Sequence, residues 1–375
     1  MAGIYLHIPF CRQACHYCDF HFSTNLKTKN EMVHALEQEL VNRANYLDEA
    51  VQTIYFGGGT PSILESVQIE NLLKIIGDSF ELANDLEITL EANPEDLNLN
   101  KLESLRKAGI NRLSIGFQTF ADTSLAWMNR IHSATEAKEA YLNAKRSDFA
   151  NISIDLIYAL PGTGSTHWQE DIEAALTLNP QHISLYGLTI ENRTVFGRLH
   201  QKGQLKEIPE DNAAKQYLYA IKMLCEHGYE HYEVANFCKP GYYSRHNSAY
   251  WAGSPYLGVG PGAHSFNGNS RQFNVRNNRK YIEGITSQNV IVELEQLSLT
   301  QLLNERILTG LRTANGISFA KIETQFGIDL RKKYRETIEQ YLKLGLVSAT
   351  GSCLKLTPKG YLVADDIALQ LFFDE

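Results

Sequence analysis

The sequence has no excess of positive charge and no long apolar run. It contains 35 Lys and Arg residues against 43 Asp and Glu residues, which gives a formal net charge of −8. Because a general nucleic-acid-binding protein carries a basic excess on at least one domain, we expect no nucleic-acid partner. No apolar stretch approaches the roughly 18 residues that a membrane-spanning helix needs. The first ten residues, MAGIYLHIPF, contain no basic segment, so we expect neither a secretory signal nor a membrane span.

Cysteine is also rare, with six residues in 375. In the reducing cytoplasm, where we expect this protein, thiols act as metal ligands or redox groups more often than they form disulfides. Three of the six lie within eight residues, at Cys11, Cys15 and Cys18. The other three have no partner spacing and are interpreted as packing or incidental thiols: Cys225, Cys238 and Cys353.

Strand-like and helix-like patterns alternate over residues 1–190. The strand patterns are Ile4–Ile8, Val51–Phe56, Leu86–Glu91, Arg112–Phe117, Ile152–Tyr158 and His182–Thr189. The helical patterns are Glu31–Asn45, Val67–Phe80, Leu102–Ala108, Thr135–Ser147 and Trp168–Leu178. This alternation predicts an α/β fold, a partial (β/α)6 TIM-like barrel of parallel strands. A doubly wound sheet is the alternative, but no Gly-x-Gly-x-x-Gly follows the first strand.

The pattern changes after residue 190. We expect a small α+β region over residues 191–298, because aromatic residues and glycines crowd Gly228–Phe273. Residues 299–375 predict a winged-helix-like domain with a hairpin at residues 346–356 and helices at Gln301–Thr313, Ser318–Phe326, Arg331–Leu344 and Pro358–Leu371. From residue 300 onward ten Lys and Arg stand against nine Asp and Glu. A DNA-reading wing should be more basic, so we interpret this domain as a lid or a partner surface.

Three kinds of site compete for the cysteine run CRQACHYCDF, residues 11–20. A zinc site needs four ligands, and His16 or His21 could supply the fourth. A haem-attachment motif would be Cys-x-x-Cys-His, but Asp19 follows Cys18. An iron–sulfur cluster held by three thiolates would leave one iron of a four-iron cube open to a substrate or cofactor.

The three-then-two spacing resembles that of the radical S-adenosylmethionine (SAM) superfamily. Members of that superfamily use a partial βα barrel with the cysteine loop after the first strand, and here the run begins three residues after Ile8. The resemblance implies a [4Fe-4S] cluster whose open iron chelates the amino and carboxylate groups of SAM. It also implies that one electron from the cluster cleaves the sulfonium and forms a 5′-deoxyadenosyl radical.

A glycine-rich turn, FGGGTPS at residues 56–62, follows the second strand pattern. Three consecutive glycines let a ligand approach the backbone, and we expect their N–H groups to be free donors. A plain strand-to-helix turn is the alternative, although one glycine would be enough for it. The turn resembles the superfamily's GGxxP-type turn, which receives the methionine amino end of SAM.

Polar residues recur where the barrel strands should end, namely Glu91, Gln118, Arg130 and Asp155. Each alone could be a surface residue, but together they fit active-site groups at the C-terminal ends of barrel strands. A carboxylate can hold ribose hydroxyls or an ammonium, and Arg can pair with a carboxylate. Asp155 interrupts an apolar strand and therefore needs a partner to offset its desolvation.

Six motifs together resemble the branch that contains oxygen-independent coproporphyrinogen III dehydrogenase and the HemW-type haem chaperones: IYLHIPFCRQACHYCDF, YFGGGTPS, EANPE, RLSIGFQTF, NRIHS and DLIYALPG. The match covers nearly the full chain. The resemblance implies that the cluster ligands are Cys11, Cys15 and Cys18. It implies SAM contacts at Tyr5, Tyr17, Gly57, Gly58, Gly59, Glu91, Gln118, Arg130, Asp155, Thr189 and His264.

Two features separate the members of this branch. The dehydrogenase has a further cysteine two residues after the third, whereas this chain has Phe20, as the chaperones do. The segment HNSAYW, residues 246–251, resembles the HNxxYW motif that is associated with haem binding in the chaperones. His246 could ligate haem iron, with Asn247, Tyr250 and Trp251 beside the macrocycle. A core loop is the alternative, and three histidines stay open as second ligands: His227, His231 and His264.

The sequence therefore predicts a haem chaperone that carries a [4Fe-4S] cluster and SAM and hands its cargo, haem, to an unknown acceptor protein. Two enzyme hypotheses remain open, radical oxidative decarboxylation by an oxygen-independent coproporphyrinogen III dehydrogenase and another radical SAM reaction on a tetrapyrrole. If SAM is cleaved, we expect an electron donor such as flavodoxin or ferredoxin. The role of SAM in a carrier, the haem axial ligand and a homodimer stay open.

Overall fold

The computed structural model describes residues 2–162, 164–287 and 292–374. Its core is a run of six parallel strands whose order in the sheet follows their order in the chain. They are β1 (Ala2–Ile8), β2 (Val51–Gly58), β3 (Leu82–Ala92), β4 (Arg112–Gln118), β5 (Asn151–Tyr158) and β6 (His182–Gly187). A doubly wound sheet would reverse direction after its first strands, so this sequential order confirms the barrel-type prediction.

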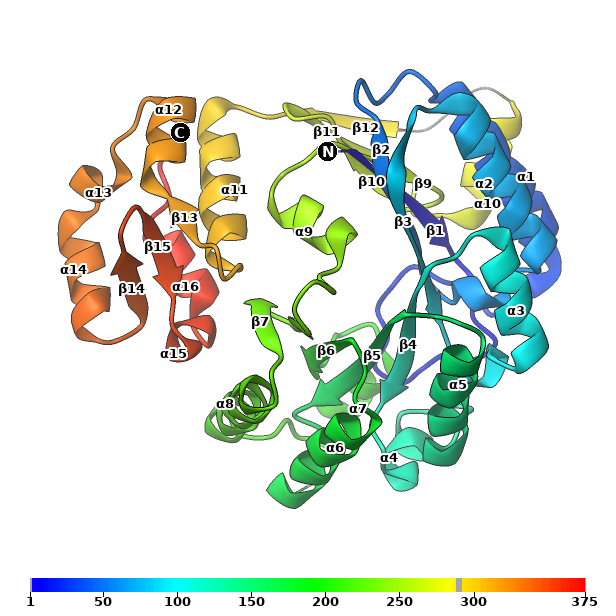
Figure 1. The fold of residues 1–375 in the computed structure, drawn as a ribbon, viewed down its shortest axis with the longest axis horizontal. Coiled ribbons are helices and arrows are strands. Elements are labelled where there is room, and N and C mark those ends of the chain that lie inside the picture. Colours follow the sequence, from blue (N-terminus) through cyan, green and yellow to red (C-terminus); the bar gives the residue numbers. More distant parts are fainter. Residues whose placement is uncertain (1, 163, 288–291, 375) are drawn as a thin grey trace.

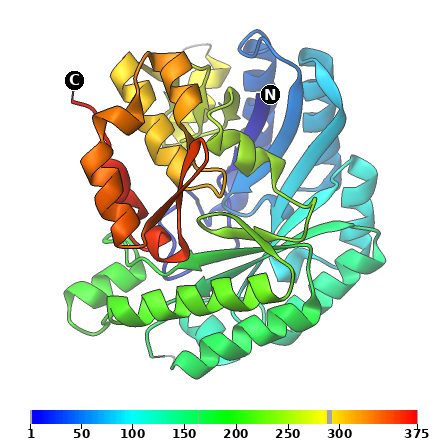
Figure 2. The same cartoon turned by 60° about the vertical axis from the view of Figure 1, so that its left-hand side comes forward.

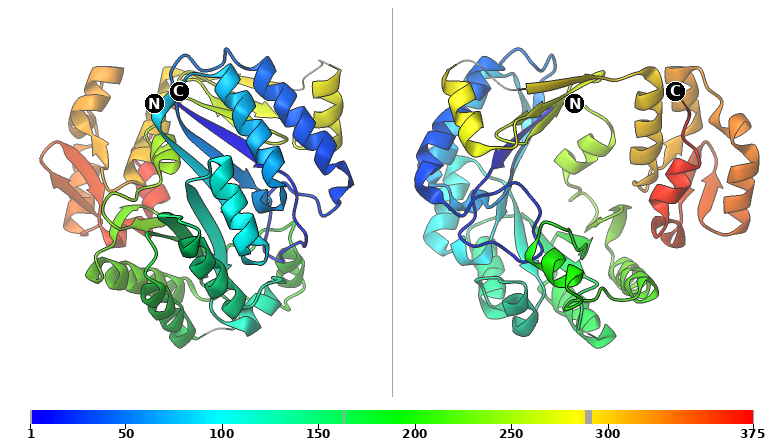
Figure 3. Two further views of the ribbon diagram at one scale, coloured as in Figure 1. Left: turned by 45° about the vertical axis from the view of Figure 1, so that its right-hand side comes forward. Right: turned by 180° about the vertical axis from the view of Figure 1, so that it is seen from behind.

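Helices cover one face of this curved sheet (Figures 1 and 3). The helices that follow the strands are α1 (Lys29–Asn42), α2 (Ser66–Ser79), α3 (Leu99–Ala108), α4 (Asp122–Trp127), α5 (Ala134–Arg146), α6 (Ser165–Leu178), α7 (Val195–Gln201) and α8 (Glu210–Glu226). Short 3-10 turns precede α1, α2 and α3 at Leu26–Thr28, Pro61–Ile63 and Pro94–Asp96. The predicted helices form within a few residues of the expected bounds.

The two faces of the strands differ in chemistry. Leu113, Ile115 and Phe117 of β4 are fully buried in the core that the helices cover. The alternate positions, Arg112 and Ser114, point to the opposite face, because side chains alternate along a strand. The same alternation runs through β1, β2, β3, β5 and β6. The barrel therefore has an apolar outer face under the helices and a polar interior.

Residues 191–298 extend this sheet at both edges. At one edge β9 (Tyr256–Val259) pairs with β1 and leads to β10 (His264–Phe266), β11 (Ser270–Asn274) and β12 (Val292–Gln296). At the other edge β8 (Asn236–Cys238) pairs with β6 and with β7 (Glu230–Glu233). Besides α7 and α8, this region contains the helices α9 (Arg245–Trp251) and α10 (Asn278–Thr286). The strands of the predicted α+β region thus join the barrel sheet, which has twelve strands in the described residues. The division into domains remains a prediction.

The C-terminal part packs beside the open side of the barrel (Figure 2). Its elements are α11 (Leu299–Leu311), β13 (Ile317–Ser318), α12 (Phe319–Phe326), α13 (Leu330–Lys333), α14 (Arg335–Lys343), β14 (Val347–Thr350), β15 (Cys353–Leu356), α15 (Pro358–Tyr361) and α16 (Ala364–Leu369). The predicted hairpin forms and gains β13 as a third strand. Two predicted single helices are each split in two, because Tyr334 and Val363 leave helical geometry at φ −110° and −129°.

Backbone hydrogen bonds join the C-terminal part to the barrel. The N–H of Val234 donates to the carbonyl of Arg312 (2.8 Å), and the N–H of Ala314 donates to the carbonyl of Tyr232 (2.9 Å). Nowhere in the described residues is a helix both long and apolar enough to cross a membrane.

Candidate functional site

The cysteine loop follows β1 directly, as predicted. Cys11, Cys15 and Cys18 are free and partly buried. Each sulfur has its own hydrogen-bond donor: the Thr60 hydroxyl donates to Cys11 (3.3 Å), the Arg130 guanidinium donates to Cys15 (3.4 Å), and a backbone N–H bond from Phe20 reaches Cys18. Donors of this kind stabilise thiolates and tune the potential of an iron–sulfur cluster.

These three thiols fit an iron–sulfur cluster better than one metal ion. No three His, Cys, Asp or Glu side chains in the described part of the chain form a group that could hold a single ion. Burial raises the pKa of Cys11 to about 12 and that of Cys18 to about 11, so metal must displace their protons. Three sulfurs with separate donors suit a cluster in which each thiolate binds a different iron atom.

Each candidate fourth ligand of a zinc site has one ring nitrogen held by a neighbour. The Nδ1 atom of His16 hydrogen-bonds the carbonyl of Trp127 (2.9 Å), and the Nε2 atom of His21 hydrogen-bonds Asn278 (2.7 Å). Phe20 offers no ligand atom, and its side chain is 72% exposed. The zinc alternative lacks support because no described group of three His, Cys, Asp or Glu side chains could hold a single ion, and not because of these two hydrogen bonds.

The glycine turn packs against the cysteine loop, and one expectation about it is wrong. The N–H groups of Gly58 and Gly59 are not free, since they donate to Glu91 Oε2 (3.2 Å) and to the carbonyl of Ile8 (2.9 Å). A Cβ atom on Gly59 would lie 2.7 Å from the carbonyl oxygen of Phe10. Close backbone approach between turn and cysteine loop thus requires glycine here.

Arg130 links the cysteine loop to two further strand ends. Its guanidinium donates to Cys15, to Asn93 Oδ1 (2.8 Å) and to the carbonyl of Gly116 (3.1 Å), while its Nε atom is buried without a partner. The Asn93 amide in turn donates to the Thr60 hydroxyl (3.4 Å). Sequence reasoning missed Asn93 and Thr60 as site residues, although both belong to quoted motifs, EANPE and YFGGGTPS. Arg130 can orient a carboxylate near the three cysteines.

Glu91 lies inside the barrel beside two tyrosines. The Tyr55 hydroxyl donates to Glu91 (2.8 Å), and the rings of Tyr5 and Tyr55 stack with centroids 6.1 Å apart. Burial raises the pKa of Glu91 to about 7, against the opposing effect of the Tyr55 hydrogen bond. This carboxyl group can therefore change its protonation state near neutral pH.

Asp155 has the partners that its burial requires. The Ser114 hydroxyl donates to it (3.1 Å), as does the Ser153 hydroxyl (3.3 Å), and Ser184 adds a further side-chain hydrogen bond. Burial raises its pKa in spite of these three hydroxyls. Asp155 and Glu91 both lie in the polar barrel interior, where the charge of Asp155 adds to burial in raising the pKa of Glu91.

The remaining predicted SAM contacts lie in different settings. Tyr17 hydrogen-bonds Cys15, beside Arg130. Gln118 has φ 69°, at an irregularity of β4, and its amide occupies the space above Gly116. Thr189 is exposed beyond the end of β6, and His264 is exposed on β10, with its ring edge against Phe273. Tyr17 therefore lies with the cysteine loop, whereas Thr189 forms none of the hydrogen bonds described for the site.

The HNSAYW segment forms the short helix α9, not the core loop that we kept as the alternative. The Ser244 hydroxyl caps it by accepting from the N–H of Asn247 (3.3 Å). The Glu87 carboxylate of β3 accepts from the N–H groups of Arg245 and His246, each at 3.1 Å. A carboxylate at a helix N-terminus stabilises the helix, so the barrel interior anchors α9.

His246 points from α9 into the barrel. Its Nδ1 atom is hydrogen-bonded to the Thr53 hydroxyl (2.9 Å), and no bond to Nε2 occurs in the described residues. Burial, and then the charge of Arg112, lower the pKa of His246 to about 4, so the imidazole is neutral at pH 7. A neutral imidazole with one nitrogen held by a neighbour presents the other to a metal.

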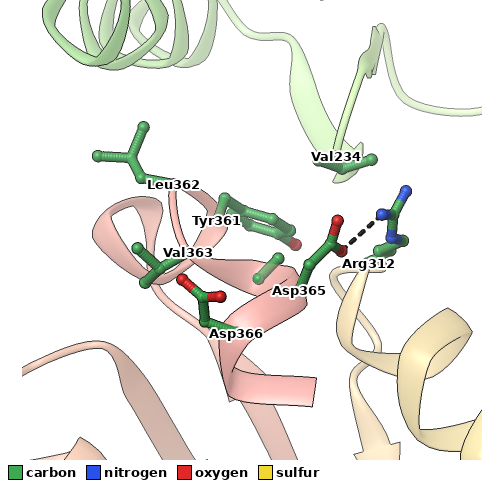
Figure 4. Close-up of a pocket in the computed structure, with 8 residues that line it drawn as sticks. Val234, Arg312, Tyr361, Leu362, Val363, Asp365 and Asp366 are labelled. Carbon is green, nitrogen blue, oxygen red and sulfur yellow. Dashed lines mark hydrogen bonds and ion pairs between the residues drawn. The ribbon is translucent and has the colours of Figure 1, made fainter. Parts of the chain in front are cut away.

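The other end of α9 faces the C-terminal part. Trp251 lies under the Arg312 guanidinium, 5.8 Å from its ring centroid, and the Arg306 guanidinium donates to the carbonyl of Ala252. Arg312 also pairs with Asp365 beside a small cavity of about 180 Å³, where the C-terminal helices meet Val234 (Figure 4). Tyr250 is 49% exposed. The motif helix is thus held between barrel and C-terminal part.

Comparison with known proteins agrees with this geometry. Residues 5–175 match the family model "Radical SAM superfamily", and residues 297–363 match "HemN C-terminal domain". Heme chaperone HemW of Bacillus subtilis is 35% identical, covering 98% of each chain. The bovine radical S-adenosyl methionine domain-containing protein 1, mitochondrial, is 32% identical, covering 99% of this chain and 87% of the bovine protein.

One solved structure shares the fold over nearly the whole chain. Coproporphyrinogen III oxidase (HemN) from Escherichia coli superposes with a TM-score of 0.85, at 24% identity, covering 99% of this chain and 90% of that chain. At this identity the likeness establishes the fold alone. The motifs, the fold and the full-length relatives together show that this chain belongs to the HemW family of radical SAM proteins.

Proposed function

We propose that this protein binds haem and passes it to an acceptor protein. The observation that carries the proposal is His246, a neutral imidazole whose Nδ1 is held by Thr53 and whose Nε2 is left for iron. The Tyr55 ring stacks on the imidazole, and Tyr250 and Trp251 add aromatic surface from the same helix. These are the side chains that an iron porphyrin needs, an axial ligand and flat apolar partners.

Phe20 favours a carrier over a coproporphyrinogen III dehydrogenase. The dehydrogenase has a fourth cysteine at the position two residues after Cys18. This chain has Phe20 there, and a phenyl ring cannot replace a thiol. The full-length relatives bear the name haem chaperone, which supports the same assignment. Radical oxidative decarboxylation of coproporphyrinogen III is the second candidate function, because the shared fold and the three cysteines suit it as well.

Cys11, Cys15 and Cys18 would hold the [4Fe-4S] cluster, and the resemblance assigns SAM to the groups around them. When bound, the cluster supplies the electron that cleaves SAM. Arg130 would orient the SAM carboxylate beside Cys15, because its guanidinium already reaches that sulfur. Glu91 and Asp155 would accept hydrogen bonds from ribose hydroxyls or an ammonium in the barrel interior.

The partners follow from these roles. An acceptor protein must take the haem, and an electron donor such as flavodoxin or ferredoxin is needed if SAM is cleaved. The six cysteines are all free, which fits a reducing cytoplasm. A homodimer stays a hypothesis.

The decisive experiment uses anaerobically reconstituted protein. Haem is titrated in and followed by the Soret band, for the wild-type protein and for His246→Ala, with His34→Ala as the control on an exposed histidine. The same preparation then receives SAM, reductant and coproporphyrinogen III, and protoporphyrinogen is assayed. Haem-loaded protein is finally mixed with an apo-haem protein to measure transfer.

Stoichiometric haem binding that is weakened by His246→Ala, transfer to the apo-protein and no decarboxylation are the expected results. Decarboxylation above that of a cluster-free control would establish the dehydrogenase instead. Failure of wild-type protein to bind haem would reject the carrier outright.

A further inference from the structure

Arg112 is a nearly buried side chain that has no hydrogen-bond or ion-pair partner among the described residues. It is the first residue of β4 and is only 2% exposed. Its side chain makes no hydrogen bond and no ion pair with any described residue, and its Nε atom is buried and unpaired. Arg cannot lose its proton in a protein, and a buried guanidinium without partners is strongly unfavourable. A group that supplies acceptor atoms to Arg112 would remove this penalty.

Two further unpaired polar atoms adjoin Arg112. Thr89 of β3 and Asn151 of β5 are its register partners on the two neighbouring strands. The Thr89 hydroxyl and the Asn151 side-chain oxygen are also buried without a partner. Paired residues of parallel strands point to the same face, so all three side chains face the barrel interior. The unpaired atoms form one row across three adjacent strands.

The carboxylates of the barrel interior accept hydrogen bonds from groups other than Arg112. Glu87 accepts from two N–H groups of α9, Glu91 accepts from Tyr55 and Gly58, and Asp155 accepts from serine hydroxyls. Glu91 and Asp155 feel Arg112 only through its charge, without a hydrogen bond to it. Among the described residues, none of these three carboxylates forms a hydrogen bond or ion pair with the Arg112 guanidinium.

Arg112 lies close to the candidate haem motif. After burial, its charge is the second cause that lowers the pKa of His246, and it acts in the same way on His182. The Arg112 guanidinium and the His246 imidazole therefore share one part of the barrel interior, against which α9 lies (Figure 1). A haem offers two matching groups, an iron for an imidazole and propionate carboxylates for a guanidinium.

We propose that Arg112, with the Thr89 hydroxyl as a second donor, binds a propionate carboxylate of the tetrapyrrole inside the barrel. The planar guanidinium presents two parallel N–H groups, which match the two oxygens of a carboxylate, whereas an ammonium would act as a point charge. The assignment of a tetrapyrrole rests on the proposed function. The assignment of a carboxylate rests on the two donors alone, the Arg112 guanidinium and the Thr89 hydroxyl.

The first test compares haem with haem dimethyl ester, in which both propionates are uncharged. Soret titrations are made on cluster-loaded wild-type protein, Arg112→Met and Arg331→Met. Arg331→Met removes the same charge from the C-terminal part, where Arg331 lies over Phe319. Wild-type protein should bind haem about 10- to 100-fold more tightly than the ester, and Arg112→Met should lose that preference. Arg331→Met should keep it.

Two results of this titration would overturn the inference. One is unchanged haem affinity in Arg112→Met. The other is an equal loss of haem and ester binding, which would give Arg112 a structural role only. Misfolding is checked by thermal unfolding, and Arg112→Met should unfold at or above the wild-type temperature, because it replaces an unpaired charge by an apolar chain of similar length.

The second test separates this site from the haem-carrier function. Sodium propionate, compared with sodium chloride at equal ionic strength, should raise the unfolding temperature of wild-type protein and not that of Arg112→Met. A propionate effect in a protein that fails to bind haem would keep the carboxylate site and reject the carrier. A third outcome is haem binding with no effect of propionate on the unfolding temperature and no preference for haem over the ester. That outcome would support the haem-carrier function and reject the carboxylate site, with water as the partner of Arg112.

Discussion

The imidazole ring of His246 stacks on the phenol ring of Tyr55, with centroids 5.0 Å apart and planes 28° apart. The Tyr55 hydroxyl points onward and donates to Glu91 at 2.8 Å. His246 belongs to the candidate haem motif and Glu91 to the predicted SAM contacts, so one tyrosine touches both. A change confined to the Tyr55 hydroxyl should therefore separate the two functions.

Tyr55→Phe should weaken SAM binding by about 10-fold and leave haem affinity near that of wild type. The substitution keeps the ring on His246 but removes a hydrogen bond that lowers the pKa of Glu91, so less of that carboxylate is ionised. SAM binding is measured by calorimetry and haem binding by the Soret band. Tyr334→Phe in the C-terminal part is the control. Equal losses of SAM and haem affinity would contradict this division.

Removal of the Thr53 hydroxyl should reduce haem affinity less than removal of the imidazole. Thr53→Val keeps the shape of the side chain but removes the hydrogen bond to His246 Nδ1. Because the imidazole is then less well oriented, haem affinity should fall on the order of 10-fold. His246→Ala should cost more and shift the Soret maximum. Unchanged affinity and spectrum in Thr53→Val would show that the Thr53 hydroxyl does not orient the imidazole, and the same result in His246→Ala would show that His246 is not the axial ligand.

Cys15→Ala should abolish the visible absorbance of the reconstituted cluster, because a cube bound by two thiolates is released or degraded. Iron and sulfide content and the absorbance spectrum are the measurements. Cys353→Ala is the matched control, since Cys353 lies on the C-terminal hairpin. A cluster retained in Cys15→Ala with normal iron content would refute the ligand assignment.

Glu91→Gln should stabilise the protein above neutral pH and not at pH 4. The pKa of Glu91 is about 7 in the folded state against 4.5 ordinarily, so the unfolded state loses its proton first as pH rises. Stability of the wild-type protein then falls between about pH 4.5 and 7, by at most about 3 kcal/mol from this group. Urea unfolding of both proteins across that range measures the difference. If the difference in free energy of unfolding between the two proteins does not increase with pH, the raised pKa of Glu91 is not the cause.

Gly59→Ala should destabilise the protein and impair cluster loading. The added Cβ would lie 2.7 to 2.9 Å from backbone atoms of Ile8 and Phe10, which cannot move without shifting the cysteine loop. Gly77→Ala in α2 is the control, because its Cβ meets its nearest neighbour at 3.8 Å and alanine favours a helix by about 1 kcal/mol. Equal unfolding temperatures for the two variants would mean that the glycine turn can shift to accept a Cβ atom at position 59.

Much of the barrel and of the site was predictable from local patterns. The strand and helix bounds followed from periodicity, and the cysteine spacing with Phe20 pointed to the site's chemistry. A further signal was overlooked: polar and apolar residues alternate in strands such as RLSIGF and NISID. Parallel strands covered on both faces are usually apolar throughout, so this alternation indicates a polar barrel interior.

The free glycine donors were a wrong expectation because sequence cannot show which backbone groups already have partners. The carbonyl of Ile8 and the carboxylate of Glu91 take the N–H groups of Gly59 and Gly58, and they come from two other strands. The splits at Tyr334 and Val363 likewise depend on packing of the C-terminal part, since neither residue breaks a helix by itself.

The sequence by itself determined the order of the elements, the three thiols and the residue types of the two motifs, because these depend on short-range spacing. Tertiary structure alone decided that residues 191–298 extend both edges of the barrel sheet, and that His246 lies against Thr53, 193 positions away. It also decided that Arg112 is buried with no hydrogen-bond partner among the described residues. Such relationships arise from strand register and chain crossing, which bring distant residues together and leave no periodic trace in the sequence.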